Sequence, residues 1–89
     1  IDDSNKGIFI DIKNILTDKI DGNTSSEEIQ TMLYEVGKNY KFENLKDYFK
    51  LVYQVLLGQE QGPRLGSFIK LYGVKETIKI IDQKLNNHK

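Results

Sequence analysis

The sequence predicts an all-α domain, a compact bundle or array of about five short helices. Three observations predict this class. Apolar residues recur at helical spacing along nearly the whole chain. Glycines and helix-capping residues separate the apolar segments. No segment alternates apolar and polar residues for long enough to form a useful strand. The length of 89 residues suits one domain, so we expect residues 1–89 to form a single one.

The first two helices are predicted on either side of a polar turn. We expect Gly22 to end the first helix as its C′ residue. Ser25 and Glu28 fit a capping box at the start of the second helix, which should end near residues 37–40. The apolar positions that predict the two helices are Ile8, Phe9, Ile12, Ile15, Leu16 and Ile20, then Ile29, Met32, Leu33 and Val36.

The third helix is predicted between a capping asparagine and a glycine. Asn44 suits the N-cap, and Asp47 lies in the first turn, where the helix dipole favours an acid. Gly58 is expected to close the helix. Its apolar stripe consists of Leu45, Tyr48, Phe49, Val52, Val55 and Leu56.

The last two helices follow a loop over residues 59–62. Pro63 fits position N1 of the fourth helix, where its missing N–H costs nothing, and Arg64 then stands at N2. We expect Gly73 to separate this helix from the fifth, and residues 86–89 to form a frayed tail. The apolar positions are Leu65, Phe68, Ile69 and Tyr72, then Val74, Thr77, Ile78, Ile81 and Leu85.

The composition argues against several classes of protein. Cysteine is absent, and His88, next to the C-terminus, is the one histidine, which excludes a thiolate nucleophile, a zinc finger and a histidine-based site within one chain. P-loop and dinucleotide-binding glycine motifs are absent as well. We therefore expect no catalytic residue, metal or cofactor here. No apolar run is long enough to span a membrane. Because the chain begins with Ile1 rather than Met, we expect it to be a piece of a longer protein.

The charges are unevenly distributed along the chain. Lys+Arg and Asp+Glu both number 13, so the formal net charge is zero. Residues 1–45 carry nine acidic residues and five lysines, whereas residues 46–89 carry four acidic residues, seven lysines and Arg64. An anionic partner should therefore meet the second half.

The segment over residues 56–68 is the least generic part of the chain. Its glycines recur every four residues, and Gly66 should lie inside a helix, where glycine costs about 1 kcal/mol relative to alanine. Something should therefore approach its backbone closely. Arg64 beside the free N–H groups of a helix start would suit an anion or a carbonyl oxygen. Two interpretations stay open: such a ligand site, or close helix packing at Gly66 with Arg64 paired to Glu60.

The aromatic and basic residues around this segment have two uses. Most of the aromatic rings should be core, but Tyr53 and Tyr72 lie where either ring could stack on a nucleobase. The lysines of this half form mainly a solvated face, which also suits phosphate contacts. They include Lys46, Lys50, Lys70, Lys75 and Lys79.

The run from Tyr53 to Gly73 resembles the C-terminal region of class I lysyl-tRNA synthetases. Its most specific part is Leu-Gly-Gln-Glu-Gln-Gly-Pro-Arg-Leu-Gly-Ser-Phe over residues 57–68. The upstream segments Ser26-Glu-Glu-Ile-Gln, Tyr34-Glu-Val-Gly-Lys and Glu43-Asn-Leu-Lys-Asp-Tyr-Phe-Lys agree with that family, so that the likeness covers residues 25–85.

The resemblance implies a cytoplasmic parent enzyme that charges tRNA(Lys) with lysine, using ATP and Mg. Such enzymes have a Rossmann-type catalytic domain with HIGH- and KMSKS-like motifs, followed by a helical anticodon-binding domain similar to that of class I glutamyl-tRNA synthetases. This chain contains neither catalytic motif. It therefore resembles the distal part of the anticodon-binding domain, with tRNA(Lys) and the catalytic domain of the same parent as partners, and should be inactive alone.

The resemblance also implies site residues. Those that match the family's Gly-Pro-Arg-x-Gly pattern are Gly62, Pro63, Arg64 and Gly66. Our hypothesis is that Arg64 and the N–H groups opening the fourth helix contact an anticodon-loop phosphate or a uracil carbonyl. Gln59 and Gln61 would read base edges, since an amide both donates and accepts. Lys70 would contact phosphate and Tyr72 would stack. The competing interpretation is that the motif sets the angle between the third and fourth helices, which Arg64 bridges.

Two other classes of function compete with RNA binding. A helical protein-interaction module would present the acidic first half, with Tyr34 or Phe42, to a protein partner, and a structural cap would make no direct contact with RNA. Salt discriminates between RNA binding and protein binding. RNA binding weakens steeply as the salt concentration rises, whereas an apolar protein interface does not. An independent small enzyme is disfavoured by the lack of a convergent acid–base constellation.

Overall fold

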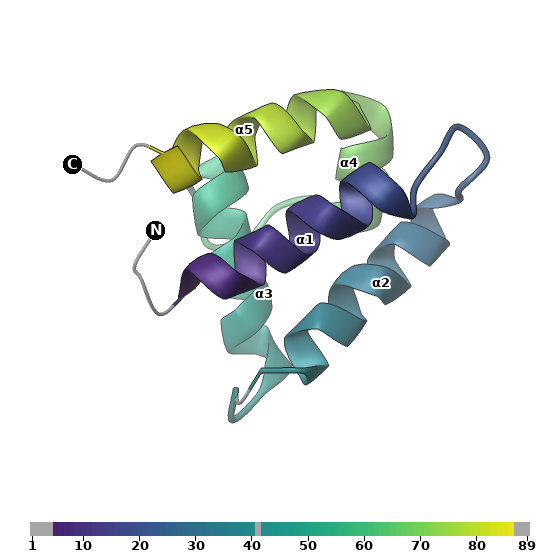
Figure 1. Cartoon of the computed structure of the whole chain (residues 1–89). Helices are drawn as coiled ribbons and strands as arrows, with labels where there is room; N and C mark the ends of the chain where they lie inside the picture. The colour runs from purple at the N-terminus through teal and green to yellow at the C-terminus, as the bar shows by residue number, and fades with distance from the viewer. Residues whose placement is uncertain (1–4, 41, 87–89) are drawn as a thin grey trace.

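The computed structural model describes residues 5–40 and 42–86, and it confirms the all-α prediction (Figure 1). No strand occurs among these residues. The helices are α1 (Lys6–Asp18), α2 (Ser26–Lys38), α3 (Leu45–Leu57), α4 (Leu65–Tyr72) and α5 (Val74–Asn86).

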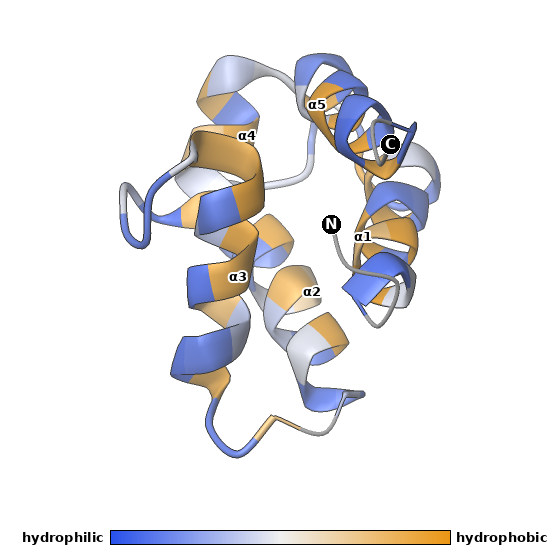
Figure 2. Ribbon diagram, turned by 90° about the vertical axis from the view of Figure 1, so that its left-hand side faces the viewer, coloured by the Kyte–Doolittle hydropathy of each residue, from blue (hydrophilic) through white to orange (hydrophobic). Residues whose placement is uncertain are grey.

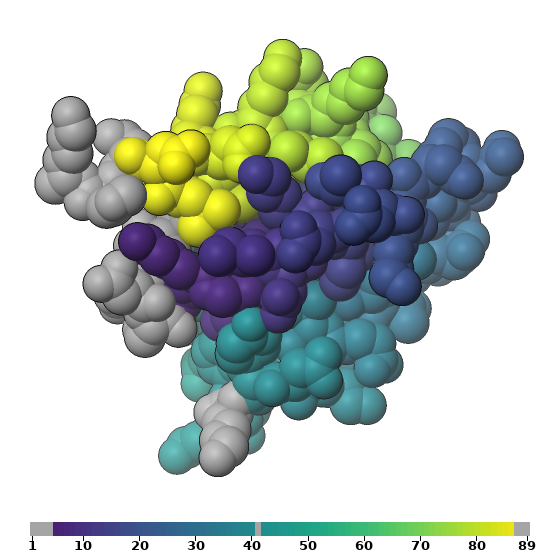
Figure 3. All heavy atoms as spheres, in the orientation of Figure 1, coloured from purple at the N-terminus to yellow at the C-terminus, as the bar shows by residue number. Residues whose placement is uncertain are grey.

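The five helices pack around one shared interior. Helices α1 and α5 lie side by side and run antiparallel, and α1 also contacts α2 (Figure 1). Helix α4 packs on α2 and α5, while α3 contacts α2 and α5. The space-filling view shows α1 as a band between α5 on one side and α2 with α3 on the other (Figure 3).

The core is built from apolar residues of all five helices. In the hydropathy view, hydrophobic stretches of α1 and α5 lie on the sides of these helices that face the other helices (Figure 2). Tyr48 is the largest fully buried side chain of the core. Its ring lies so close to Gly37 that a Cβ there would come within 2.6 Å of the ring, and its hydroxyl donates to the carbonyl of Leu33 at 2.6 Å. The other buried apolar residues are Ile8, Phe9, Ile12, Leu16, Ile29, Leu33, Val36, Val52, Leu56, Leu65, Ile69 and Ile81.

The caps predicted for α2 and α3 are confirmed. The Ser25 side chain accepts from the Glu28 N–H and the Glu28 side chain accepts from the Ser25 N–H, which completes the capping box. The Asn44 side chain accepts from the N–H of Lys46 at the start of α3. At the other end of α3, Gly58 adopts the left-handed conformation with φ of 70°, which glycine reaches without strain.

The prediction for the end of α1 is wrong. The helix stops at Asp18, with Lys19 as its C-cap, and Gly22 lies in the following turn without a positive φ. The turn is instead held by its own polar side chains, which accept from backbone N–H groups within the turn. The N–H of Asp21 donates to Thr24 Oγ1 at 3.0 Å, and the N–H of Asn23 donates to Asp21 Oδ1 at 2.7 Å.

The prediction for the start of α4 is wrong by two residues. The helix begins at Leu65 with Arg64 as its N-cap, so Pro63 lies outside the helix and not at N1. A contact with α3 accompanies this later start. The carbonyl of Pro63, which a helix starting there would use internally, accepts from the Tyr53 hydroxyl at 2.8 Å.

The start of α5 follows the prediction, and its end differs from it. Gly73, with φ of 116°, is the single residue between α4 and α5. At the far end, Asn86 is still helical rather than part of a frayed tail. The rest of the predicted tail, residues 87–89, lies outside the described residues.

Candidate nucleic-acid interface

The loop between α3 and α4 presents its polar side chains to solvent. Gln59 and Gln61 are exposed, and so is Arg64. The Arg64–Glu60 pair of one interpretation does not form, and Glu60 lies 3.9 Å from the Nζ of Lys50. Within the described ranges, Arg64 makes no ion pair. The guanidinium therefore stands at the start of α4 with its charge available to a ligand.

Tyr53 holds this loop against α3. Its hydroxyl donates to the carbonyl of Pro63, and a Cβ at Gly62 would lie 3.5 Å from its ring and 2.9 Å from a methyl of Leu57. Burial raises the pKa of the Tyr53 hydroxyl above its usual value. The contact gives Tyr53 a structural use, and its ring is partly buried rather than free to receive a base.

Gly66 is the point where α4 touches α2. A Cβ at Gly66 would overlap the backbone carbonyl oxygen of Ser26 and would come within 3.0 Å of the backbone nitrogen of Gln30. The Gly66 N–H donates to Gln30 Oε1 at 2.8 Å, which gives a partner to one of the unpaired N–H groups of the first turn. Close helix packing therefore explains Gly66. The packing partner is α2, not α3, so the expectation that the motif sets the angle between α3 and α4 through Gly66 and an Arg64 bridge is wrong.

Lys70 also has an internal contact. Its ammonium donates to the carbonyl of Thr24 at 2.7 Å, which ties α4 to the turn between α1 and α2. Lys70 lies on a different side of α4 from Arg64, since residues six apart do not share a helix face. The predicted site residues are therefore divided: Gln59, Gln61 and Arg64 lie together, and Lys70 lies apart from them.

The far end of α4 carries an exposed aromatic and aliphatic surface. Phe68 and Tyr72 stack with ring centroids 5.2 Å apart and an interplanar angle of 12°. Tyr72 is 47% exposed and the neighbouring Leu71 is 92% exposed. Tyr72 was among the predicted site residues, whereas Leu71 and the ring stack were not predicted. The four-residue spacing of the two rings was the available signal.

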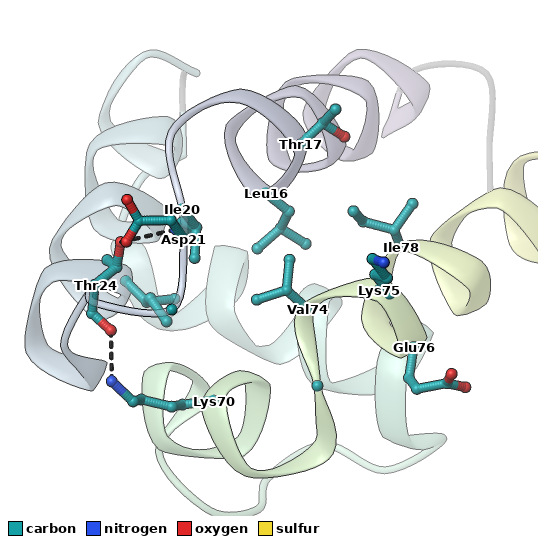
Figure 4. Close-up of a pocket in the computed structure, with 13 residues that line it drawn as sticks. Leu16, Thr17, Ile20, Asp21, Thr24, Lys70, Val74, Lys75, Glu76 and Ile78 are labelled. Carbon is teal, nitrogen blue, oxygen red and sulfur yellow. Dashed lines mark hydrogen bonds between the residues drawn. The ribbon is translucent and has the colours of Figure 1, made fainter.

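A groove was also missed, between the α1–α2 turn and the junction of α4 with α5 (Figure 4). It has a volume of about 680 Å³, and its wall is mainly apolar, with Leu16, Ile20 and Val74 among its lining. The Lys70–Thr24 bond lies at one end of it (Figure 4). No local pattern could reveal this groove, because its lining comes from segments that are far apart in the sequence.

The polar groups of the described residues do not converge on a catalytic or metal-binding arrangement. No group of three or more His, Cys, Asp or Glu side chains gathers in a way that would hold a metal ion there. Within the same part of the chain, no helix is long and apolar enough to cross a membrane.

Comparison with known proteins identifies lysine–tRNA ligases among the similar sequences. A lysine–tRNA ligase of Rickettsia felis is 51% identical over 83 residues, which cover 93% of this chain and 16% of the relative. Lysine–tRNA ligases of Rickettsia prowazekii and Rickettsia akari are 48% and 54% identical over 88 and 78 residues. The chain thus spans about 16% of the length of the curated relatives that it matches. No family model matches the chain, and no solved structure matches it.

Proposed function

We propose that this chain is a region of a class I lysine–tRNA ligase and that it binds the anticodon arm of tRNA(Lys). The observation that carries the proposal is the identity of about half over 93% of the chain with lysine–tRNA ligases. The finer assignment to class I and to the anticodon domain rests on the Gly-Pro-Arg-x-Gly resemblance over residues 62–66.

The geometry of the α3–α4 loop supports RNA contact by Arg64. Its guanidinium is exposed and has no ion pair with a described residue, and Arg64 is the N-cap of α4, at the positive end of the helix dipole. Gln59 and Gln61 precede Arg64 in the same loop and are exposed as well. We propose that Arg64 contacts a phosphate or a uracil carbonyl and that the two amides read base edges.

The parent enzyme would supply the chemistry. We propose that it joins lysine to tRNA(Lys) in the cytoplasm, using ATP and Mg bound by a catalytic domain elsewhere in the same chain. The present region would orient the tRNA and would be inactive by itself. It would need no cofactor for that task, because it contributes only contacts to RNA.

A structural cap is the second candidate, and two contacts favour it. The Gly66 N–H and the Lys70 ammonium both bind groups within the fold, at Gln30 and Thr24. Part of the recognised motif therefore serves packing. Under this alternative the region supports the enzyme without touching RNA.

A binding titration separates the two candidates. The chain is titrated with tRNA(Lys) and with a transcript whose anticodon uridines are replaced, at low and moderate salt. An anticodon reader binds the intact transcript more tightly, and its affinity falls as salt rises. Equal binding of both transcripts would refute base readout and would favour the cap.

The role of Arg64 is tested with a charge-matched control. Arg64→Ala should weaken binding about 10- to 100-fold, because a hydrogen bond to a charged group is lost. It should also lower the slope of log K against log salt by about 0.7 if the contact is one phosphate of a single strand. Lys84→Ala removes the same charge from the far end of α5 and should change little. Full affinity in a folded Arg64→Ala protein would refute the contact.

A further inference from the structure

The stacked rings of α4 form a surface that is already ordered without a ligand. Phe68 is partly buried and packs against the core, and its ring lies nearly parallel to that of Tyr72. Tyr72 stays 47% exposed although one side of its ring is covered. A ring held in this way loses little conformational freedom when a flat partner stacks on it.

The two rings lie on the same face of α4 as Arg64, which belongs to the Gly-Pro-Arg-x-Gly motif. Arg64, Phe68 and Tyr72 follow at intervals of four residues and so share one face of the helix. Leu71 is next to this face and is almost fully exposed. We call these four residues the α4 row. At 1.5 Å of rise per residue, about 12 Å separates Arg64 from Tyr72 along the axis.

The charge around the α4 row suits an anionic partner. Arg64 belongs to the row, and residues 61–75 contain no acidic residue, while Lys70 of this segment lies on another side of α4 and donates to the Thr24 carbonyl. The other exposed tyrosine offers a contrast. Tyr34 is 42% exposed on α2, a helix that carries three glutamates, and its ring is covered by the ammonium of Lys38 at 5.6 Å. Of the exposed tyrosines among the described residues, only Tyr72 lies in a segment without acidic residues.

We propose that the α4 row is a stacking site for an unpaired nucleobase of RNA, with Tyr72 under the base and Arg64 near a phosphate of the same strand. This inference rests on the proposed function and deepens it. Stacking accepts every base, because each has a π-face. The row therefore contributes affinity and holds the loop splayed, while discrimination between bases is left to the amides of the α3–α4 loop.

The test uses the 89-residue chain and an anticodon stem-loop hairpin of tRNA(Lys) with 2-aminopurine at one unpaired position. The fluorescence of 2-aminopurine falls when the base stacks. Tyr72→Leu should weaken binding about 5- to 150-fold and abolish the quenching, as expected for the loss of one stacked base. Tyr72→Phe keeps the aromatic ring and should retain both the affinity and the fluorescence quenching. Tyr34→Leu is the matched control and should behave as the wild type.

The outcomes distinguish this inference from the proposed function. If Tyr72→Leu binds and quenches as the wild type does, the stacking site is refuted even if the intact anticodon is still preferred, and the exposed side chains would then suit a protein interface. If the chain binds RNA without preferring the intact anticodon, but Tyr72→Leu weakens this binding, the stacking site is supported and the proposed anticodon recognition is refuted. Absence of RNA binding refutes both. Thermal melts of the variants verify that each is folded.

Discussion

Replacing Gly66 with alanine tests the close contact between α2 and α4. The added Cβ would overlap the carbonyl oxygen of Ser26 and would lie 3.0 Å from the Gln30 nitrogen, and both are backbone atoms. A flexible side chain could move aside, but a helix backbone cannot, so α4 would have to withdraw from α2. The withdrawal would also break the Gly66–Gln30 hydrogen bond.

The magnitude follows from three contributions. Overpacking against rigid neighbours costs about 3 kcal/mol, the upper part of the usual range. Loss of the hydrogen bond adds about 1 kcal/mol. The higher helix propensity of alanine returns about 1 kcal/mol. We therefore expect Gly66→Ala to lower the free energy of unfolding by about 3 kcal/mol and the Tm by about 12–24 °C for a domain of this size.

Urea and thermal unfolding followed by circular dichroism would measure the change. Gly22→Ala is the matched control, because Gly22 has no atom within 4 Å of its would-be Cβ and no positive φ, so that stability should change by less than about 0.5 kcal/mol. If Gly66→Ala were as stable as the wild type or more stable, helix propensity alone would govern the site. The close approach of α2 would then not be the reason for glycine there.

Three further predictions concern stability. Gly58→Ala should cost about 1–2 kcal/mol in urea unfolding, from left-handed strain alone, because φ is 70° and no atom lies within 4 Å. Tyr48→Phe should cost about 0.5–1.5 kcal/mol in the same assay, since it removes the buried hydroxyl that donates to Leu33. The Tyr40 hydroxyl donates to Asp11 Oδ2 at 2.7 Å, and chiefly this bond raises its pKa from 10.0 to about 12. The resulting stability is full below pH 10 and is lost as the pH rises through 12, so Tyr40→Phe should flatten the stability curve measured over that interval.

Local sequence patterns were sufficient to predict structure where a helix is capped by residues close to its own ends. Ser25 and Glu28 close a capping box within four residues, and Asn44 caps α3 through a neighbour two positions away. Such bonds are formed by groups that are close in the sequence, so their geometry follows from residue type and spacing. The apolar periodicity predicted all five helices for the same reason.

Two of the predictions that failed depend on partners more distant in the sequence, whereas the end of α1 depends on polar side chains of the turn that follows it. Pro63 was expected inside α4, but Tyr53, ten positions earlier, takes its carbonyl. Arg64 was expected to pair with Glu60 under one interpretation, but Lys50 lies closer to that carboxylate. A glycine inside the helix predicted a close neighbour at Gly66, but no local pattern indicated that this neighbour is the backbone of α2.

The sequence alone thus determined the helical class, most of the caps and the residues of the exposed loop at Gln59, Gln61 and Arg64, because these follow from periodicity and short-range bonding. Tertiary structure alone decided that Gly66 and Lys70 serve packing, that Phe68 and Tyr72 stack beside the exposed Leu71, and that a groove opens beside α4. The physical reason is that close packing brings together backbone and side-chain groups from separate helices, and no local pattern records which of them will meet.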